Sequence, residues 1–466
     1  DEIKRINPFD WDTEFADIIK VGGFDAVIGN PPYVRQEGLK EQKKYLEAHY
    51  TVYQGTADLY AYFIEKGINL LRPKGQFSYI VANKWMRANY GRPLRKFLLT
   101  KQIEEIVDFG DLPVFKTATT YPCIIRVSNE KPIREFSVST VKALDFPSLD
   151  EYVVSNWYTI NPKTLTDDGW TLGNEDTEKL LKKLQSAGHS LEEYVEGQFF
   201  YGIKTGLNEA FVIDDQTKTE LVKNDPSCAP LIKPFLIGKD IKRYKFPESK
   251  KHLIFIPKGW TNLQSNGVAN KWKWLKEKYP SIAGHLEPFS EACQKRYDQG
   301  GYWWELRECD YYTEFEKPKL IYLVFQVKPA FTLDSHGTYY VNNAVWTIPK
   351  NDPYLLGILN SKLGWLLISN YCTQIQGGYQ LIFKYLGRIP IRTINFADPT
   401  DKARHDSMVM LVTKMLDLNK RLQDARLDQE KTQLSRQIEA TDAAIDTLVY
   451  ELYGLTEEEI AVVEGK

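Results

Sequence analysis

The segment FDAVIGNPPY, residues 24–33, decides how the first part of the chain folds. Residues 24–28 form a short apolar run of the kind that makes a strand, and NPPY (30–33) follows after one glycine. We therefore expect the NPPY side chains to emerge at the carboxyl end of a parallel strand, where open α/β sheets bind their ligands. The alternative is an ordinary proline-rich turn with a capping Asn.

Strand-like and helical patterns alternate between residues 24 and 141. A helix is expected over 58–71, and RPKG (72–75) ends it because proline and glycine stop helices. The strand-like runs are FDAVI (24–28), QFSYIVA (76–82), IEEIVDF (103–109) and CIIRV (123–127). This order predicts an α/β fold with a mostly parallel sheet. The last two runs have no helix between them, which suits an antiparallel hairpin at the sheet edge.

After the first domain, the composition and periodicity of the sequence change twice. A stretch with several prolines and glycines and little periodicity is interpreted as a connector, and a region rich in aromatic residues and short strand-like runs follows it. Residues 404–453 contain neither Gly nor Pro and carry two apolar seams out of phase, which fits a helical hairpin or one helix with a phase shift. The predicted divisions are a first domain at 1–145, a connector at 146–190, a second domain at 191–398 and a C-terminal helical segment at 399–466.

Composition excludes several classes of protein. With 466 residues, 43% of them hydrophobic, the chain is long enough for two to four domains, and no window reaches the roughly 20 apolar residues that cross a bilayer. The 5 cysteines never form CxxC and the 6 histidines never form HExxH, so we expect no metal site and a cytoplasmic protein. The net charge of −2 means that any site for nucleic acid must be a local basic patch.

The residue types in NPPY suit methylation of an exocyclic amine. An aromatic amino nitrogen is a poor nucleophile because its lone pair is delocalised into the ring. The amide oxygen of Asn30 and the backbone carbonyl of Pro31 are two acceptors that could hold its two hydrogens and draw the nitrogen toward tetrahedral geometry. The ring of Tyr33 could then stack on the base.

Several segments in this order resemble N6-adenine-specific DNA methyltransferases of the TaqI-like and fused type II (type IIG) restriction-modification kind. In the first domain these are FDAVIGNPPY, ADLYAYFIEKGINLLRPKGQFSYIVANKWM (57–86) and LPVFKTATTYPCIIRV (112–127). The segments LIKPFLIGKDIKRYKF (231–246) and 339–391 are similar to the specificity domain that follows in this family, and IDTLVYELYGLTEEEI (445–460) is similar to the end of the fused enzymes.

The resemblance implies a partial Rossmann-like methyltransferase sheet with an antiparallel seventh strand, a mixed α+β target recognition domain and a helical end. It also implies S-adenosylmethionine as methyl donor and double-stranded DNA as partner, with the target adenine flipped out of the stack. Asn30, Pro31 and Tyr33 match the catalytic motif, and Phe115 matches the aromatic residue that packs against the flipped adenine. A core phenylalanine at a strand end is the alternative for Phe115.

The chain departs from the family pattern upstream of NPPY. Family members carry a glycine-rich turn there that holds the methionine part of the donor, and Gly22 and Gly23 cannot serve because they lie before a strand and not after one. We therefore expect the chain to be the C-terminal part of a longer or split enzyme, with an incomplete donor pocket and no methylation by itself. Any endonuclease activity is expected in the missing upstream half.

Candidate DNA contacts lie in three places. Between 231 and 251, seven Lys and Arg residues face only two acidic ones, which is typical of a phosphate-contacting surface. A glycine-bounded loop within 201–213 and an amide-rich loop near 374–380 could read base edges, although a hairpin turn and a surface turn are the alternatives. The predicted DNA-binding residues are Lys204, Thr205, Asn208, Lys233, Lys239, Lys242, Arg243, Lys245, Gln374 and Gln376.

Three functions fit the sequence. The first is a site-specific DNA adenine methyltransferase of a restriction-modification system, present as its NPPY half with a recognition domain. The second is a stand-alone DNA-binding specificity module without catalysis. The third is a methyltransferase acting on RNA or on protein glutamine, and the long aromatic and basic region behind the NPPY half favours DNA over these substrates.

Overall fold

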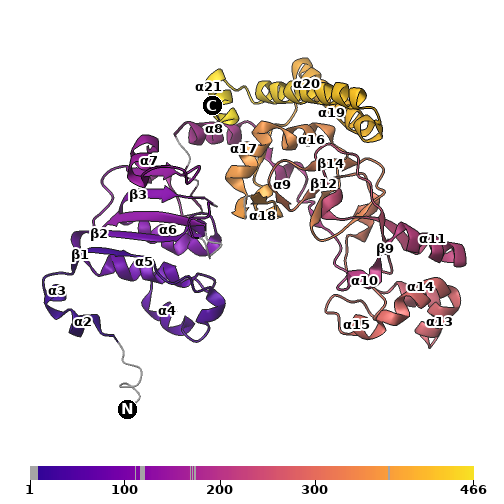
Figure 1. Ribbon diagram of the computed structural model, residues 1–466, viewed down its shortest axis with the longest axis horizontal. Coiled ribbons are helices and arrows are strands. Elements are labelled where there is room, and N and C mark those ends of the chain that lie inside the picture. The colour runs from indigo at the N-terminus through magenta and orange to yellow at the C-terminus, as the bar shows by residue number, and fades with distance from the viewer. Residues whose placement is uncertain are drawn as a thin grey trace, which may run out of the picture. The chain divides into compact units, whose positions relative to one another are not determined.

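The computed structural model describes residues 9–110, 112–115, 121–167, 169–170, 172, 175–375 and 378–465. The chain forms two compact units that divide between Leu180 and Leu181, and we call them the N-terminal and the C-terminal unit. Figure 1 shows the first in indigo to magenta and the second in magenta to yellow. Among the described residues, no helix is both long and apolar enough to cross a membrane.

The N-terminal unit is built on a 6-stranded sheet with the order β1-β2-β4-β3-β5-β6. Strand β1 pairs in parallel with β2, and β3 pairs in parallel with β5, whereas β4 runs antiparallel to both β2 and β3. This arrangement confirms the α/β prediction. The strands are β1 (Phe24–Gly29), β2 (Leu71–Ala82), β3 (Gln102–Asp108), β4 (Pro122–Ser128), β5 (Phe136–Thr140) and β6 (Tyr158–Ile160).

The antiparallel pair β3–β4 forms as predicted, but its predicted place at the sheet edge is wrong. Strand β4 lies between β2 and β3 and is paired on both sides. Its alternate residues Cys123, Ile125 and Val127 are fully buried. A strand this apolar is more stable in the interior of a sheet than at an edge, where one row of its backbone groups would be unpaired.

Helices α5 (Leu59–Asn69) and α6 (Arg92–Leu98) contribute to one core with the sheet. The predicted helix over 58–71 is thus confirmed with slightly different ends. Gly67 is required in α5 because a Cβ atom there would lie 2.7 Å from the ring of Phe77 on β2. The other described helices of this unit are α2 (Trp11–Glu14), α3 (Ala16–Lys20), α4 (Lys43–His49), α7 (Leu149–Asn156) and the first half of α8 (Glu175–Ser186).

The opposite face of the sheet is covered only in part. Helix α7 packs there against a small cluster that includes Val107 on β3 and Ile124 on β4. On β1, by contrast, Ile28 is 86% exposed. Within the described residues β1 pairs only with β2, so its outer edge is open.

The stretch 146–190, which the sequence indicated as a connector with little periodicity, contains regular structure. This stretch contains α7, the sheet strand β6 and helix α8. Strand β6 pairs with β5 and places Ile160 in the core. The sequence pattern is weak because β6 has only 3 residues and α7 buries none of its side chains.

The C-terminal unit contains two 4-stranded sheets with the orders β15-β10-β11-β9 and β14-β12-β16-β8, and a 3-stranded sheet β13-β18-β17. Helices α13 (Lys271–Lys278) and α14 (Pro280–Leu286) bury Leu275, Ile282 and Leu286 in the same core as β10 and β11. The main strands are β8 (Phe200–Tyr201), β9 (Val212–Asp214), β10 (Ile232–Leu236), β11 (Lys251–Ile254), β12 (Lys319–Leu323), β13 (Phe325–Gln326), β14 (Phe331–Asp334), β15 (Tyr340–Val341), β16 (Val345–Ile348), β17 (Thr373–Ile375) and β18 (Gly378–Gln380).

The chain ends in a helical hairpin, one of the two predicted arrangements. Helices α19 (Pro399–Asp424) and α20 (Asp428–Leu452) run side by side (Figure 1, yellow). They pack on α16 (Pro353–Asn360) and α17 (Lys362–Tyr371) of the same unit. Gly357 permits the close approach, because a Cβ atom there would lie 2.6 Å from the sulfur of Met408 and 3.0 Å from Val412. The hairpin thus packs against its own chain.

A buried ion pair joins β12 to β14. Lys319 and Asp334 are opposite each other in the antiparallel register, their Nζ and Oδ2 atoms are 2.6 Å apart, and their side chains are 0% and 2% exposed. The Lys319 ammonium also donates to the Phe315 carbonyl at 2.7 Å. Buried charges of this kind are tolerated only when both partners are present.

We predict that Lys319→Met destabilises the C-terminal unit by about 3 to 5 kcal/mol, because the carboxylate of Asp334 is left buried without its counter-ion. Urea unfolding followed by tryptophan fluorescence measures this loss. Lys317→Met is the matched control, since Lys317 is 58% exposed and its surface pair with Glu314 contributes about 1 kcal/mol at most. Equal effects of the two changes would contradict a structural role of the buried pair.

Candidate functional site

The carboxyl ends of β1, β2 and β3 meet at one edge of the N-terminal sheet, because the three strands run parallel to one another. Asn30 directly follows β1, Asn83 directly follows β2, and Asp108 is the last residue of β3. Ligands of open α/β sheets bind at such an edge. The strand placement that the sequence predicted for NPPY is therefore the one observed.

The two acceptors of NPPY have no hydrogen-bond donor within the described part of the chain. The Asn30 residue is exposed, and its amide group forms no hydrogen bond with the described part of the chain. The Pro31 residue is buried, yet its carbonyl oxygen accepts no hydrogen bond among the described residues. Two adjacent oxygen acceptors without protein donors can accept hydrogen bonds from a ligand.

Hydrogen bonds to the start of α5 fix the loop after NPPY. The Val34 carbonyl accepts from the Leu59 backbone N–H at 3.0 Å, and the Asp58 carboxylate accepts from the Gln36 backbone N–H at 3.2 Å. Within the loop, the Val34 N–H donates to the Pro32 carbonyl at 3.0 Å. The fixed φ angles of the two prolines and these bonds hold the acceptors in a defined orientation.

Tyr33 and Phe115 form an aromatic pair beside the acceptors. Their ring centroids are 6.4 Å apart with an interplanar angle of 67°, and Tyr33 is 36% exposed. The Tyr33 hydroxyl makes a long contact of 3.5 Å with the Ile80 carbonyl on β2. The structure thus brings Phe115, which lies 82 positions further along the chain, next to NPPY.

Burial raises the pKa of two nearby titratable groups, Tyr33 and Cys123. Desolvation raises the pKa of the Tyr33 phenol, and the neighbouring Cys123 raises it further. Burial also raises the pKa of the Cys123 thiol well above its usual value, with Asp108 adding to the effect. Neither group is a ready base or thiolate nucleophile at neutral pH, so the groups of this edge suit hydrogen bonding and stacking.

Two polar residues of this edge were missed by the sequence reading. The Asn83 amide donates to the Asp108 carboxylate at 2.8 Å, and the same carboxylate oxygen accepts from the Gly110 backbone N–H at 2.9 Å. These bonds join the ends of β2 and β3. Their position in the sequence could have identified them, because Asn83 and Asp108 each lie at the end of a predicted strand.

The predicted DNA contacts of the loop within 201–213 differ in burial: two of the side chains are exposed and one is buried. Lys204 and Asn208 are exposed, whereas Thr205 is only 2% exposed and its hydroxyl donates to the Asn208 side chain at 2.7 Å. The guanidinium of Arg296, which is buried, donates to the Thr205 carbonyl. Thr205 is therefore part of the loop's internal structure, and only Lys204 and Asn208 present side chains to a ligand.

The basic segment 231–251 contains some cations that pair with carboxylates and others that do not. Lys233 pairs with Glu316 at 3.2 Å, and Arg243 forms a bidentate ion pair with Asp442 at 2.6 and 2.7 Å. Lys239 and Lys242 are exposed and Lys245 is half-buried, and none of these three pairs with a described carboxylate. Gln374 is half-buried on β17, and Gln376 lies outside the described residues.

The structure therefore assembles two of the predicted groups. Asn30, Pro31, Tyr33 and Phe115 meet at one sheet edge of the N-terminal unit, and Lys242, Arg243 and Lys245 share one turn of the C-terminal unit. The other predicted contacts lie on separate elements of the C-terminal unit. Among the residues with described placement, no three His, Cys, Asp or Glu side chains form a group that could hold a metal ion.

Comparisons with known proteins assign both units. Residues 1–115 match the family model of the Eco57I restriction-modification methylase, and residues 233–391 match that of the TaqI-like C-terminal specificity domain. The chain is 26% identical to the type II restriction enzyme and methyltransferase RM.Eco57I of Escherichia coli, over 100% of this chain and 49% of that protein. It is 24% identical to the type II methyltransferase M.BstVI of Geobacillus stearothermophilus, over 97% of this chain and 77% of that protein.

The fold is also similar to that of a solved structure. The type IIL restriction-modification enzyme MmeI in complex with DNA aligns with a TM-score of 0.61 and 14% identity, over 97% of this chain and 57% of that chain. The chain thus spans about half the length of RM.Eco57I and of MmeI. The chain thus carries an Eco57I-like methylase region followed by a TaqI-like specificity domain, and over nearly its whole length it is similar to type II restriction-modification methyltransferases.

Proposed function

We propose that this chain is the NPPY half and the target recognition domain of a site-specific DNA methyltransferase that transfers a methyl group from S-adenosylmethionine to N6 of adenine. The observation that carries the proposal is the pair of free acceptors on Asn30 and Pro31 at the carboxyl edge of the sheet. The enzyme would act on double-stranded DNA in the cytoplasm. The names of the relatives and the specificity-domain match support DNA as the substrate.

The geometry of this edge suits the chemistry of an amino group. The Asn30 amide oxygen and the Pro31 carbonyl oxygen accept the two N–H bonds of the adenine amine, which shifts electron density onto nitrogen as it attacks the methyl carbon. The new N–C bond would form as the methyl–sulfur bond of the donor breaks, which releases S-adenosylhomocysteine, and the N6 proton would then pass to water, so no strong base is needed at nitrogen beforehand. This agrees with the neutral state of Tyr33 and Cys123, whose pKa values burial raises.

The aromatic pair Tyr33 and Phe115 supplies the surface for the base. An adenine inside a duplex cannot reach the acceptors, so it must be flipped out, and the lost stacking costs a few kcal/mol. An exposed Tyr33 ring beside Phe115 can replace part of that stacking. We propose that Tyr33 lies against the face of the base and Phe115 against its edge.

The open edge of β1 is where we propose that the rest of the methyltransferase domain joins. Strand β1 is apolar, Ile28 is 86% exposed, and the outer backbone groups of the strand are unpaired within the described residues. Further parallel strands that carry the donor-binding turn would cover this edge. They would come from the upstream part of the same polypeptide or from a separate chain.

Asn30→Ala is the direct test of the acceptor pair. In the enzyme completed with its upstream half, we expect turnover to fall by about a hundredfold or more while duplex affinity stays nearly unchanged, because the lost acceptor acts mainly in the transition state. Transfer of a tritiated methyl group to a duplex measures turnover, and fluorescence anisotropy measures binding.

Asn156→Ala is the matched control, since Asn156 is exposed on α7 and bonds only within its helix, to the Tyr152 carbonyl. It should retain full turnover. A loss of duplex binding in Asn30→Ala would make NPPY a structural turn, and unchanged turnover would refute its catalytic role.

The proposal also predicts the behaviour of this chain alone. Gly22 and Gly23 precede β1 and so do not form a strand-to-helix turn that could hold the donor. We expect calorimetry to show no S-adenosylmethionine binding in the micromolar range by residues 1–466 and methyl transfer to appear only when the upstream half is added. A micromolar dissociation constant for the isolated chain would contradict the incomplete donor pocket.

The same assay separates the alternatives. A chain that binds duplex DNA but gains no methylation with the upstream half would be a specificity module without catalysis. Methylation of RNA or of protein glutamine in preference to duplex DNA would move the same NPPY chemistry to another substrate.

A further inference from the structure

A cavity of about 990 Å³ lies in the C-terminal unit between the basic segment, the end of β13 and the C-terminal helices. Five cationic side chains line it but only two carboxylates, those of Asp442 and Glu464. Both carboxylates are already neutralised, the first by Arg243 at 2.6 Å and the second by Lys362 at 2.9 Å. The remaining lining cations are Lys242, Lys245 and Lys328, and none of these pairs with a described carboxylate.

The cavity therefore has an excess of positive charge and no free anion among its described lining residues. Its other lining residues are of two kinds. Some are polar and uncharged, such as Ser369 and Asn419, and others are apolar or aromatic, with Phe325 39% exposed, Val327 59% exposed and Trp365 half-buried. Unpaired ammonium groups beside apolar surface suit a polyanion that also has apolar parts. A DNA strand, with its phosphates and deoxyriboses, has this composition.

Two of the lysines are presented by one tight turn. The Lys245 backbone N–H donates to the Lys242 carbonyl at 3.2 Å, which closes the turn 242–245. Within it Tyr244 has φ 54°, in the left-handed region that bulky residues rarely adopt. Such a conformation persists only where the surroundings over-determine it, and it brings the two lysines to adjacent positions.

The contacts that hold the turn are extensive. Tyr244 is 1% exposed, and its backbone N–H donates to the Phe331 carbonyl on β14 at 3.0 Å. The Lys245 carbonyl accepts from the Thr332 hydroxyl at 2.5 Å. The guanidinium of Arg243 lies 5.0 Å from the centre of the Tyr244 ring. The turn is thus fixed to β14 at two successive residues.

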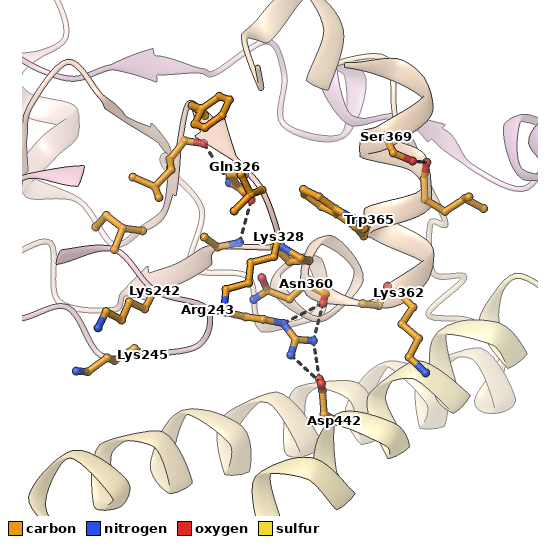
Figure 2. Close-up of a pocket in the computed structure, with 18 of the residues that line it drawn as sticks. Lys242, Arg243, Lys245, Gln326, Lys328, Asn360, Lys362, Trp365, Ser369 and Asp442 are labelled. Carbon is orange, nitrogen blue, oxygen red and sulfur yellow. Dashed lines mark hydrogen bonds and ion pairs between the residues drawn. The ribbon is translucent and has the colours of Figure 1, made fainter. Parts of the chain in front are cut away.

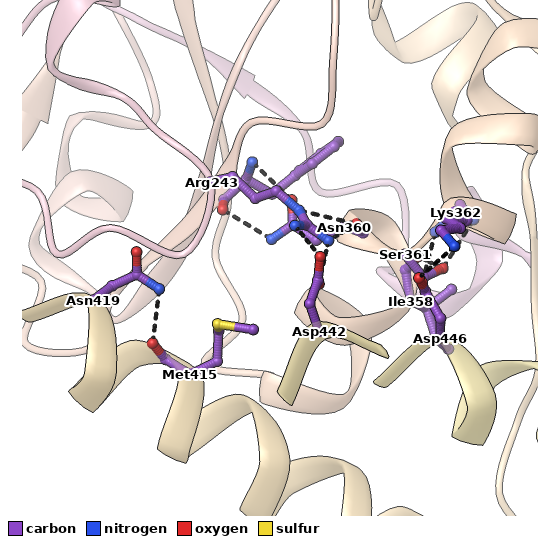
Figure 3. A network of polar contacts seen from close by, with 11 residues as sticks. Arg243, Ile358, Asn360, Ser361, Lys362, Met415, Asn419, Asp442 and Asp446 are labelled. Carbon is purple, nitrogen blue, oxygen red and sulfur yellow. Dashed lines mark hydrogen bonds and ion pairs between the residues drawn. The ribbon is translucent and has the colours of Figure 1, made fainter. Parts of the chain in front are cut away.

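Arg243 links the turn to the C-terminal helices. Its guanidinium donates to the Asn360 carbonyl at the end of α16 at 2.6 and 3.1 Å and to both carboxylate oxygens of Asp442 on α20. Figure 3 shows this network, and Figure 2 shows Arg243 directed toward Asp442 while Lys242 and Lys245 point away from it. Arg243 is committed to internal partners, so the two lysines remain for a ligand.

We infer that this cavity binds the sugar–phosphate backbone of duplex DNA through Lys242, Lys245 and Lys328, and that Arg243 with Asp442 positions the turn without contacting phosphate. The inference rests on the proposed function, since it takes duplex DNA as the ligand. It adds Lys328 from a distant segment to the contact surface, and it changes the role of Arg243 from phosphate contact to positioning residue.

The first test replaces the three lysines together. In the full chain carrying Lys242→Gln, Lys245→Gln and Lys328→Gln, anisotropy with a labelled mixed-sequence duplex between 50 and 300 mM NaCl should give a log–log salt slope smaller by about 2 to 3. Affinity at the lowest salt should fall about tenfold or more. The matched control changes Lys218, Lys223 and Lys414 to Gln, which removes the same charge from α11 (Asp215–Asn224) and α19 outside the cavity.

A slope and affinity equal to those of the control would overturn the inference while leaving duplex binding itself intact. No duplex binding by the unaltered chain would overturn the proposed function together with the inference. The two failures are therefore distinguishable in one titration series.

The second test asks whether Arg243 and Asp442 position the turn. The direction of the change in DNA affinity distinguishes this role from a purely electrostatic one. Asp442→Asn removes a negative charge near the cavity, so a purely electrostatic role predicts tighter DNA binding. A positioning role predicts binding weaker by about threefold to tenfold with an unchanged salt slope, because the lysines remain but the turn loses its anchor. Arg243→Lys should weaken binding in the same way, since Lys keeps the charge but not the bidentate geometry. Tighter binding or a smaller slope in these variants would refute the positioning role.

Discussion

The parallel pairing of β1 with β2 is the constraint on which the NPPY site depends. The register places Gly29 opposite Tyr79, so the chain leaves β1 at the same level at which β2 approaches its own carboxyl end. Gly29 permits this pairing, because a Cβ atom there would lie 2.9 Å from the Tyr79 ring. A shift of one residue would turn every side chain of β1 to the opposite face and move the Asn30 amide away from its present position.

The two units carry different parts of the proposed reaction. The N-terminal unit holds two acceptors that directly follow β1, a loop after them that is tied to the start of α5, and an aromatic pair. The C-terminal unit holds the basic turn, and that turn is secured by β14, α16 and α20. Both sites use rigid elements to orient a few polar groups, which is how a binding site keeps its geometry without a ligand.

Much of the N-terminal unit was predictable because its signals are local. The apolar runs at 76–82 and 123–127 became strands, and the position of NPPY after a strand followed from adjacent residues. Long-range pairing was less predictable. Nothing local shows that β4 lies inside the sheet or that Phe115 lies against Tyr33, because both depend on how distant segments pack. The roles of Thr205 and Arg243 were hidden for the same reason, since their partners Arg296 and Asp442 lie about 90 and 200 residues further along the chain.

The bare edge of β1 also bears on how this polypeptide behaves at high concentration. Asp25 is the one charged residue of the strand, and it is engaged by Arg72 at 2.5 Å. Natural sheets protect their margins with lysines, prolines or bulges, and β1 has an irregularity only near Phe24. No described strand pairs with this outer edge, so β1 can pair with the backbone of another molecule, and we expect self-association to increase with protein concentration.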